Sequence, residues 1–216
     1  MRKPSKQINI RFQLLLMASI GLLFCLPVLG QSFQTKKETA QKGMTFYPYT
    51  HIDTESIYSD SSGISVLIQN SHRKGGGYTN AEGNSFFSAI YWYRIINQTS
   101  HPLELSIHFP GDSFPALPSE DSYVKVFLLK DTMSIAKEGM YAYGATSLPS
   151  VLDAGLKEAT QLTEAIAPRG TSLFYISALF YHASTPSGAE LVVRRQKFFY
   201  KIGGLEIPCG EILIKK

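Results

Sequence analysis

The sequence predicts an all-β fold: an antiparallel sandwich of two sheets, with one short helix near residues 148–156. Two observations support this fold class. Short strand-like stretches alternate with glycine- and proline-containing turns along most of the chain. The stretch Phe86–Asn97 is rich in aromatic and β-branched residues and is apolar at both odd and even positions, so a strand there would be buried on both faces.

The stretch Phe86–Phe109 is the one that the rest of the chain is arranged to cover. In its second half, Leu103–Phe109, apolar and polar residues alternate, which is typical of a half-buried strand. Residues Asn97–Pro102 between the halves have turn chemistry, because Asn and Ser bond locally to backbone and Pro fixes φ. Phe86–Asn97 and Leu103–Phe109 are therefore predicted to be neighbouring strands.

Similar patterns predict the remaining strands and connections. Predicted strands are Thr45–Tyr49, Ile64–Gln69, Tyr123–Leu129, Thr160–Ile166, Leu173–His182, Leu191–Tyr200, Leu205–Ile207 and Glu211–Ile214. Leu173–His182 is nearly all apolar and is the natural neighbour of Phe86–Asn97. Gly203-Gly204 predicts a two-residue hairpin turn. Asn70–Asn84 is predicted to be a mobile hairpin loop and Pro110–Asp121 a proline-rich connection.

A single short helix is expected after residue 147. Its continuation through Lys157–Ala167 is the alternative to the Thr160–Ile166 strand, which is favoured because Pro168-Arg169-Gly170 ends it. Ser147 is a candidate N-cap, and Pro149 is tolerated in a first turn. Leu148, Leu152 and Leu156 lie four apart, so they form one apolar stripe that can dock on a sheet. For 131–144 the sequence predicts no element.

Composition divides the chain into three segments. Residues 1–30 have a basic start and an apolar run that ends before a plausible cleavage site, the layout of a secretory signal peptide. A retained membrane anchor is the alternative, although the apolar run is short for a membrane span. Residues 31–43 are polar and aperiodic and are expected to be a flexible leader, and 44–216 a single β-sandwich domain. We expect a periplasmic or extracellular protein with no membrane span after signal cleavage.

Charge and cysteine content exclude several kinds of site. Four of the 21 Lys and Arg lie in residues 1–30, which leaves 17 against 17 Asp and Glu. A neutral chain without a basic stripe predicts no nucleic-acid partner. Beyond residue 30 the single cysteine is Cys209, so neither an internal disulfide nor a clustered-cysteine zinc site is possible there. We expect Cys209 to be a buried, inert thiol.

A fold-level resemblance rests on turn chemistry. Asn97-Gln98-Thr99 precedes an alternating strand, and Pro168-Arg169-Gly170-Thr171-Ser172 leads into an apolar strand. Over about residues 86–200 this arrangement resembles the immunoglobulin-like β-sandwich domains of exported bacterial proteins. The resemblance implies a fold and carries no functional residues, and the paired cysteines of antibody domains are absent from this chain.

No motif assigns a catalytic, cofactor-binding or metal-ligating residue, so we expect no cofactor. The histidines form no H-x-H or H-E-x-x-H pair. The best local pair is His108 with Asp112, although His108 falls on the polar side of its strand. The glycine-rich Asn70–Asn84 lacks the Lys-Ser/Thr ending of a phosphate loop, and Gly63-Ile64-Ser65 lacks the closing glycine of a nucleophile elbow. Glu120-Asp121 is a solvated pair in a loop.

Aromatic residues leave one further possibility open. Exposed tyrosines can stack on sugar faces, and five tyrosines lie outside the strongest strands: Tyr47, Tyr49, Tyr78, Tyr141 and Tyr143. The alternative is that these rings fill the core and its margin, as aromatic residues do in a sandwich without disulfides.

Three functions remain open at this point. The first is a non-catalytic exported binding or envelope-associated domain that acts through loops such as Asn70–Asn84 and Pro110–Asp121 on an unknown protein or glycan. The second is an accessory subunit that joins a partner by edge-strand pairing. The third is a hydrolase with a site built from distant loops. A flat aromatic face would favour a glycan, an unpaired edge strand the accessory subunit, and a deep polar pocket the enzyme.

Overall fold

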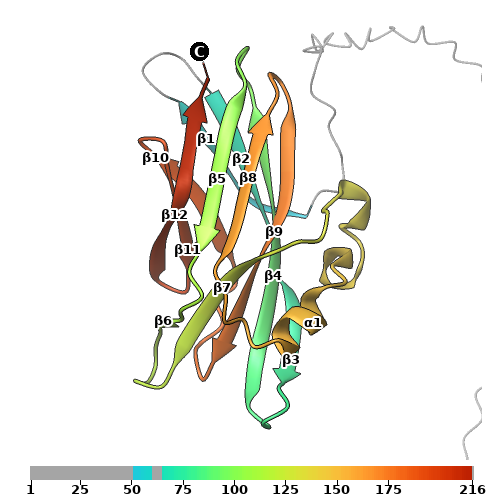
Figure 1. Ribbon diagram of the computed structural model, residues 1–216, viewed down its shortest axis with the longest axis vertical. Coiled ribbons are helices and arrows are strands. Elements are labelled where there is room, and N and C mark those ends of the chain that lie inside the picture. The colour runs from blue at the N-terminus through green and yellow to red at the C-terminus, as the bar shows by residue number, and fades with distance from the viewer. Residues whose placement is uncertain (1–50, 60–64, 216) are drawn as a thin grey trace, which may run out of the picture. The chain divides into compact units, whose positions relative to one another are not determined.

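The computed structural model describes residues 51–59 and 65–215, and it consists mostly of β-strands in two antiparallel sheets (Figure 1). The predicted signal peptide, leader, Thr45–Tyr49 strand and Gly63-Ile64 lie outside the described residues. Within these residues, no helix is long and apolar enough to cross a bilayer.

The larger sheet has the order β1-β2-β4-β9-β7-β6, with β3 beside β4, and the smaller has the order β10-β11-β12-β5-β8. The strands of the larger sheet are β1 (Ile52–Ser59), β2 (Ser65–Ser71), β3 (Lys74–Thr79), β4 (Ser85–Asn97), β6 (Phe114–Pro115), β7 (Tyr123–Leu129) and β9 (Thr171–Tyr181). Those of the smaller are β5 (Leu103–Phe109), β8 (Thr160–Ile166), β10 (Ala189–Arg194), β11 (Lys197–Ile202) and β12 (Leu205–Ile214).

The pair β4 and β9 forms the centre of the larger sheet. Their register runs from Phe87 opposite Phe180 to Ile96 opposite Thr171. Along β4, Tyr93 on one face and Trp92 on the other are both fully buried. The expectation that Leu173–His182 would pair with Phe86–Asn97 is therefore confirmed, and both faces of Phe86–Asn97 are covered except near Phe86, which is half-buried.

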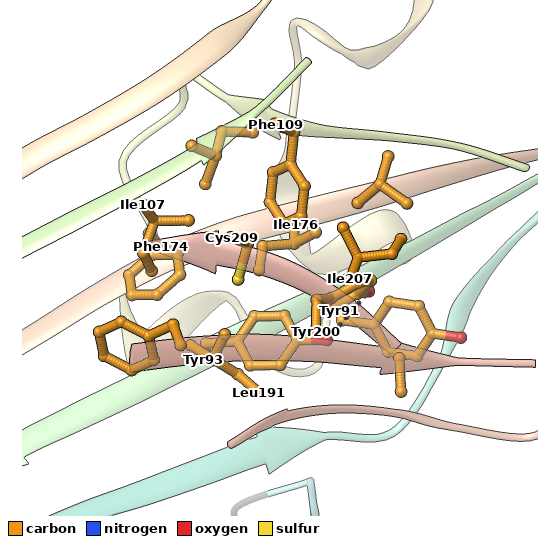
Figure 2. Close-up of a cluster of buried hydrophobic side chains, with 14 of the residues drawn as sticks. Tyr91, Tyr93, Ile107, Phe109, Phe174, Ile176, Leu191, Tyr200, Ile207 and Cys209 are labelled. Carbon is orange, nitrogen blue, oxygen red and sulfur yellow. Dashed lines mark hydrogen bonds between the residues drawn. The ribbon is translucent and has the colours of Figure 1, made fainter. Parts of the chain in front are cut away.

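The inner faces of the two sheets enclose one core. Figure 2 shows its centre, where side chains of β4, β5, β9, β10, β11 and β12 meet. The Tyr93 hydroxyl donates to the Tyr200 hydroxyl at 3.2 Å, and the rings of Phe109 and Tyr200 pack edge to face with centroids 5.5 Å apart. Because a buried hydroxyl without a partner is costly, this bond stabilises two tyrosines of the core, whereas the hydroxyl of Tyr91 has no partner among the described residues.

A second cluster covers the outer face of the larger sheet. It is supplied by residues 130–159, which we name the covering segment, between β7 and β8. The segment contains two short 3₁₀ turns, Ile135–Lys137 and Tyr141–Gly144, and α1 (Leu148–Asp153). The buried side chains of the covering segment pack against Ile90, Trp92 and Tyr175 of the sheet. These side chains are Met133, Ala142, Tyr143, Leu148, Leu152 and Leu156. The predicted leucine stripe therefore docks on the sheet, with Leu156 just beyond the end of α1.

Polar contacts fix the covering segment at its 3₁₀ turns. The Lys74 ammonium donates to the carbonyl oxygens of Glu138 and Met140 and lies 4.2 Å from the centroid of the Tyr143 ring. The Tyr143 hydroxyl donates to the His72 carbonyl, and the Tyr143 carbonyl accepts from Tyr175 at 2.7 Å. These bonds connect strands β3 and β9 to one loop, which explains how a segment with little regular structure can cover a sheet.

Several sequence-based expectations are wrong. The first concerns Asn70–Asn84, which is not simply a loop, because it contains β3 paired with β4. Gly75 has φ +132°, and a Cβ there would lie 2.0 Å from the Ser88 carbonyl oxygen. Glycine thus permits the two strands to approach closely, and the same lack of side chains removes the alternation that would have revealed a strand.

The second error concerns Leu191–Tyr200, which forms the end of β10 and most of β11 rather than one strand. Arg195 and Gln196 make the turn with φ values of 50° and 67°, a conformation usually provided by glycine or asparagine. The predicted Gly203-Gly204 turn is present, but the two strands predicted after it, Leu205–Ile207 and Glu211–Ile214, are one continuous strand, β12.

The third error concerns Ser147, whose side chain does not cap α1. Its hydroxyl instead donates to the Asp131 carboxylate. The Asp131 carboxylate also accepts from the backbone amides of Thr146 and Ser147, so it ties the start of α1 to the end of β7.

Asn97 stabilises the junction between the sheets. Its side-chain amide donates to the carbonyl oxygens of His101 at 2.8 Å and Ala167 at 2.9 Å, with that of Ile166 at 3.2 Å, and its oxygen accepts from the backbone and hydroxyl of Thr99. Asn97→Asp would replace the donor by an oxygen facing carbonyl oxygens. We expect a loss of about 2–4 kcal/mol in the free energy of unfolding, measured by urea denaturation.

The exposed Asn84 provides the control, because its side chain contacts no described polar group. Asn84→Asp should change the free energy of unfolding by less than about 0.5 kcal/mol. Equal stabilities for Asn97→Asp and Asn84→Asp would contradict the stabilising role of Asn97.

Cys209 is fully buried in the core, and burial raises the pKa of its thiol to about 12. Because the thiolate is the reactive form, Cys209 should resist a thiol-specific reagent while the protein is folded and react fully in denaturant. The assay uses a Cys25→Ser variant, so that Cys209 is the single thiol. Reaction of the folded protein at the rate of a free cysteine would show that the core is not closed around it.

Candidate functional site

Four aromatic rings lie side by side on the outer face of the larger sheet, one on each of β3, β4, β9 and β7. We name Tyr78, Phe86, Tyr181 and Tyr123 the aromatic row. Tyr78 is opposite Phe86, and Tyr181 is opposite Tyr123, in the strand register. Successive ring centroids are 6.2, 5.1 and 5.0 Å apart. Strand pairing therefore sets the order and spacing of these rings.

The aromatic row adjoins a cavity of about 310 Å³ that opens to solvent, which we name the hollow. Phe86 and Leu179, from β4 and β9, lie between Tyr78 and Tyr123, which come from the outer strands β3 and β7. Leu152, Gly155, Leu156 and Lys157 line it from the end of α1 and the residues that follow. The remaining lining residues are Asn80, Glu82, Ser113 and Lys125.

The polar side chains of the hollow are largely uncommitted. Glu82, Ser113, Lys125 and Lys157 make no side-chain hydrogen bond to another described residue, whereas Asn80 accepts from the Asn84 amide at 2.8 Å. Partial burial lowers the pKa of Lys125, and the charge of Asp112 opposes this shift. The hollow thus offers both donors and acceptors beside aromatic surface.

Ser88 adds a buried polar group next to the hollow. It lies on the same face of β4 as Phe86 and is opposite Leu179 in the register, and both of these residues line the hollow. Its hydroxyl is buried and has no hydrogen-bond partner among the described residues. Since buried hydroxyls are usually satisfied, this oxygen is a candidate contact for a buried water, and Ser88 itself does not line the hollow.

A larger cavity of about 520 Å³ lies at the β11–β12 turn. It is lined by the two turn glycines and by charged side chains such as Lys201 and Glu206, without an aromatic residue. Glu206 already forms an ion pair with Arg194. Ligand sites are usually apolar concavities with a few convergent polar groups, and the hollow beside the aromatic row fits that description better.

Both loops proposed from the sequence as interaction segments contribute to the hollow. Asn70–Asn84 supplies Tyr78, Asn80 and Glu82, and Pro110–Asp121 supplies Ser113. Of the other tyrosines considered as a platform, Tyr141 is 84% exposed but outside the hollow and Tyr143 is buried. Tyr47 and Tyr49 lie outside the described residues.

The sequence predicts strands at Phe86 and Tyr123 but no site. Their position on the outer face follows from the strand pattern, but the sequence does not show where the covering segment ends. Only the structure shows that this end of an apolar face stays partly open.

The residues considered for catalysis do not converge. His108 is exposed on the outer face of β5 and makes no hydrogen bond to Asp112. Separate histidine–carboxylate pairs are His51–Glu138, His72–Asp53 and His182–Asp121, at 4.0, 3.2 and 3.9 Å. Across residues 51–59 and 65–215, no three His, Cys, Asp or Glu side chains are grouped as metal ligands would be.

Comparison with known proteins gives no further assignment, because no protein-family model, curated protein or solved structure matches the chain. The case for the hollow therefore rests on its own geometry.

Tyr78 provides a direct test of that geometry. Its hydroxyl donates to the Asp153 carboxylate at 2.7 Å, and this hydrogen bond raises the pKa of Tyr78 to about 12. In Asp153→Ala the pKa of Tyr78 should fall towards the ordinary value of about 10, measured by NMR of ¹³C-labelled tyrosine rings. An unchanged pKa would mean that the end of α1 does not approach β3 as described.

Proposed function

We propose that this chain is a non-catalytic binding domain of an exported protein, and that the hollow is its binding site. The observation that supports this function best is a concave, aromatic-walled surface whose polar groups have few partners within the protein. Such groups gain most from a ligand, because they do not have to break internal hydrogen bonds to bind it. The basic start and apolar run of residues 1–30 support export.

We also propose that the two sheets follow the immunoglobulin-like arrangement that the turn chemistry suggests. In support, the turn at Pro168-Arg169-Gly170 leads directly into the core strand β9, with Arg169 at φ 60°. This proposal concerns the fold and implies no ligand.

A second candidate function is an accessory subunit, supported by β1. This eight-residue strand is at one edge of the larger sheet, and its Ile57 is 63% exposed. An edge strand presents unpaired backbone groups to which a partner strand can add.

The binding function is tested by screening the chain against saccharides, peptides, acyl compounds and nucleotides with ligand-observed NMR. Ser113→Trp places a large ring at the opening of the hollow, so it should abolish binding of the class that is recognised. Glu120→Trp is the matched control, because Glu120 is exposed in the same segment but does not line the hollow.

Three results would contradict this function. Ligand binding that survives Ser113→Trp would place the site elsewhere. Binding that is lost in Ile57→Lys but kept in Ser113→Trp would favour the accessory subunit. Turnover of ester, glycoside or peptide substrates that Ser113→Trp abolishes would show that the hollow is an enzyme site.

A further inference from the structure

We propose that the ligand of the hollow is a saccharide of uncharged sugar units, bound by ring stacking and by hydrogen bonds to its hydroxyls. This inference rests on the proposed function, because it names the class of molecule that the same site accepts. Its support comes from the walls, the polar rim, the charge balance and the size of the hollow.

The walls suit a ring that is apolar on its faces and polar around its circumference. Tyr78 and Tyr123 come from the two outer strands of the four that carry the aromatic row, with Phe86 and Leu179 between them. An aromatic face carries partial negative charge, and the C–H groups on a sugar face carry partial positive charge. Stacking therefore favours a pyranose ring without requiring the ligand to be aromatic.

The rim suits hydroxyl groups, each of which can both donate and accept. Lys125 and Lys157 can only donate, Glu82 only accepts, and Ser113 does both. A ligand with hydroxyls in several directions can satisfy this mixed set, whereas a purely apolar chain would leave it unpaired.

The charge balance argues against a strongly charged ligand. The two lysines of the hollow are matched by Glu82 and by Asp112, which acts on Lys125. Phosphate groups are usually bound by unopposed cationic groups or by backbone amides at a helix start, and α1 contributes its other end here. A neutral saccharide places no net charge into this balanced site.

A proline-rich peptide is the main competitor, since such peptides bind aromatic-lined grooves. Proline has no backbone N–H, so a proline-rich segment offers mostly acceptors. The Glu82 carboxylate would then face a ligand with few hydrogen-bond donors. The acceptor in the rim therefore favours a saccharide over a proline-rich peptide.

The size of the hollow favours a short oligosaccharide. Its volume of about 310 Å³ is at the lower limit of ligand pockets, which span about 300–1,000 Å³, so it encloses only a compact ligand. The aromatic row continues to Tyr181, but the His182 ring stacks on it with centroids 3.9 Å apart and occupies that face, so the hollow itself sets the length of the ligand.

The test is isothermal titration of the full chain with neutral oligosaccharides (glucan, mannan, galactan and chitin fragments), with a proline-rich peptide and a sugar phosphate as competitors. We expect one oligosaccharide to bind, with affinity that changes little between about 0.1 and 1 M salt, over which the Debye length falls from about 10 to 3 Å. Tyr123→Ala and Tyr78→Ala should each weaken binding at least about tenfold, whereas Tyr123→Phe, which keeps the ring, should stay within about twofold.

Tyr141→Ala is the matched control, because Tyr141 is an exposed tyrosine outside the hollow, and it should bind as the unaltered chain does. Thermal unfolding of each variant separates loss of binding from loss of fold. Suppose that the peptide or the sugar phosphate binds, that no oligosaccharide binds, and that Ser113→Trp abolishes the binding. This result would overturn the saccharide inference and leave the binding function intact. Absence of any ligand sensitive to Ser113→Trp would overturn both.

Discussion

The structure depends on the pairing of β4 with β9, because both strands are apolar on both faces. On the inner face Tyr93 pairs with Phe174, and on the outer face Trp92 pairs with Tyr175. Burying apolar surface contributes about 25 cal/mol per Å², and one opposing sheet can cover only one face of this pair. A second layer is therefore needed, and residues 130–159 supply it. The fold is two sheets plus an irregular outer cover held by polar contacts such as those of Lys74.

The candidate site is a consequence of the same constraint. α1 ends at Asp153, and the chain turns away at Leu156, which has φ 47°. The strands continue past the residues that the covering segment protects, and this part of their outer face carries the aromatic row. Polar residues of the β3–β4 turn and of the segment before β7 surround the uncovered part, as Asn80 and Ser113 do. Tyr78, Phe86 and Tyr123, which belong to the aromatic pairs at this sheet end, thus also line the hollow.

Much of the fold could be predicted from the strand period, and little of the site could. Leu103–Phe109 alternates in the sequence, and Tyr123–Leu129 places Val124, Val126 and Leu128 on one face; both form strands with those bounds. β3 was missed because Gly75–Gly77 has no side chains to alternate, and the β10–β11 turn was missed because Arg195 and Gln196 take a conformation typical of glycine. The site was predicted only through Tyr78 and two loops. Whether a ring on an apolar face is covered depends on where a distant irregular segment ends, and the local pattern does not contain that information.

Trp92 tests the double-sided burial most directly, because it is the single tryptophan of the chain and lies on the outer face beneath the covering segment. Its fluorescence should be emitted at the short wavelength of an indole in apolar surroundings, and acrylamide should quench it weakly until the protein unfolds. Emission typical of water-exposed indole from the folded protein, with quenching as efficient as that of free tryptophan, would show that the outer face is uncovered and would contradict the burial of β4 and β9 on both faces.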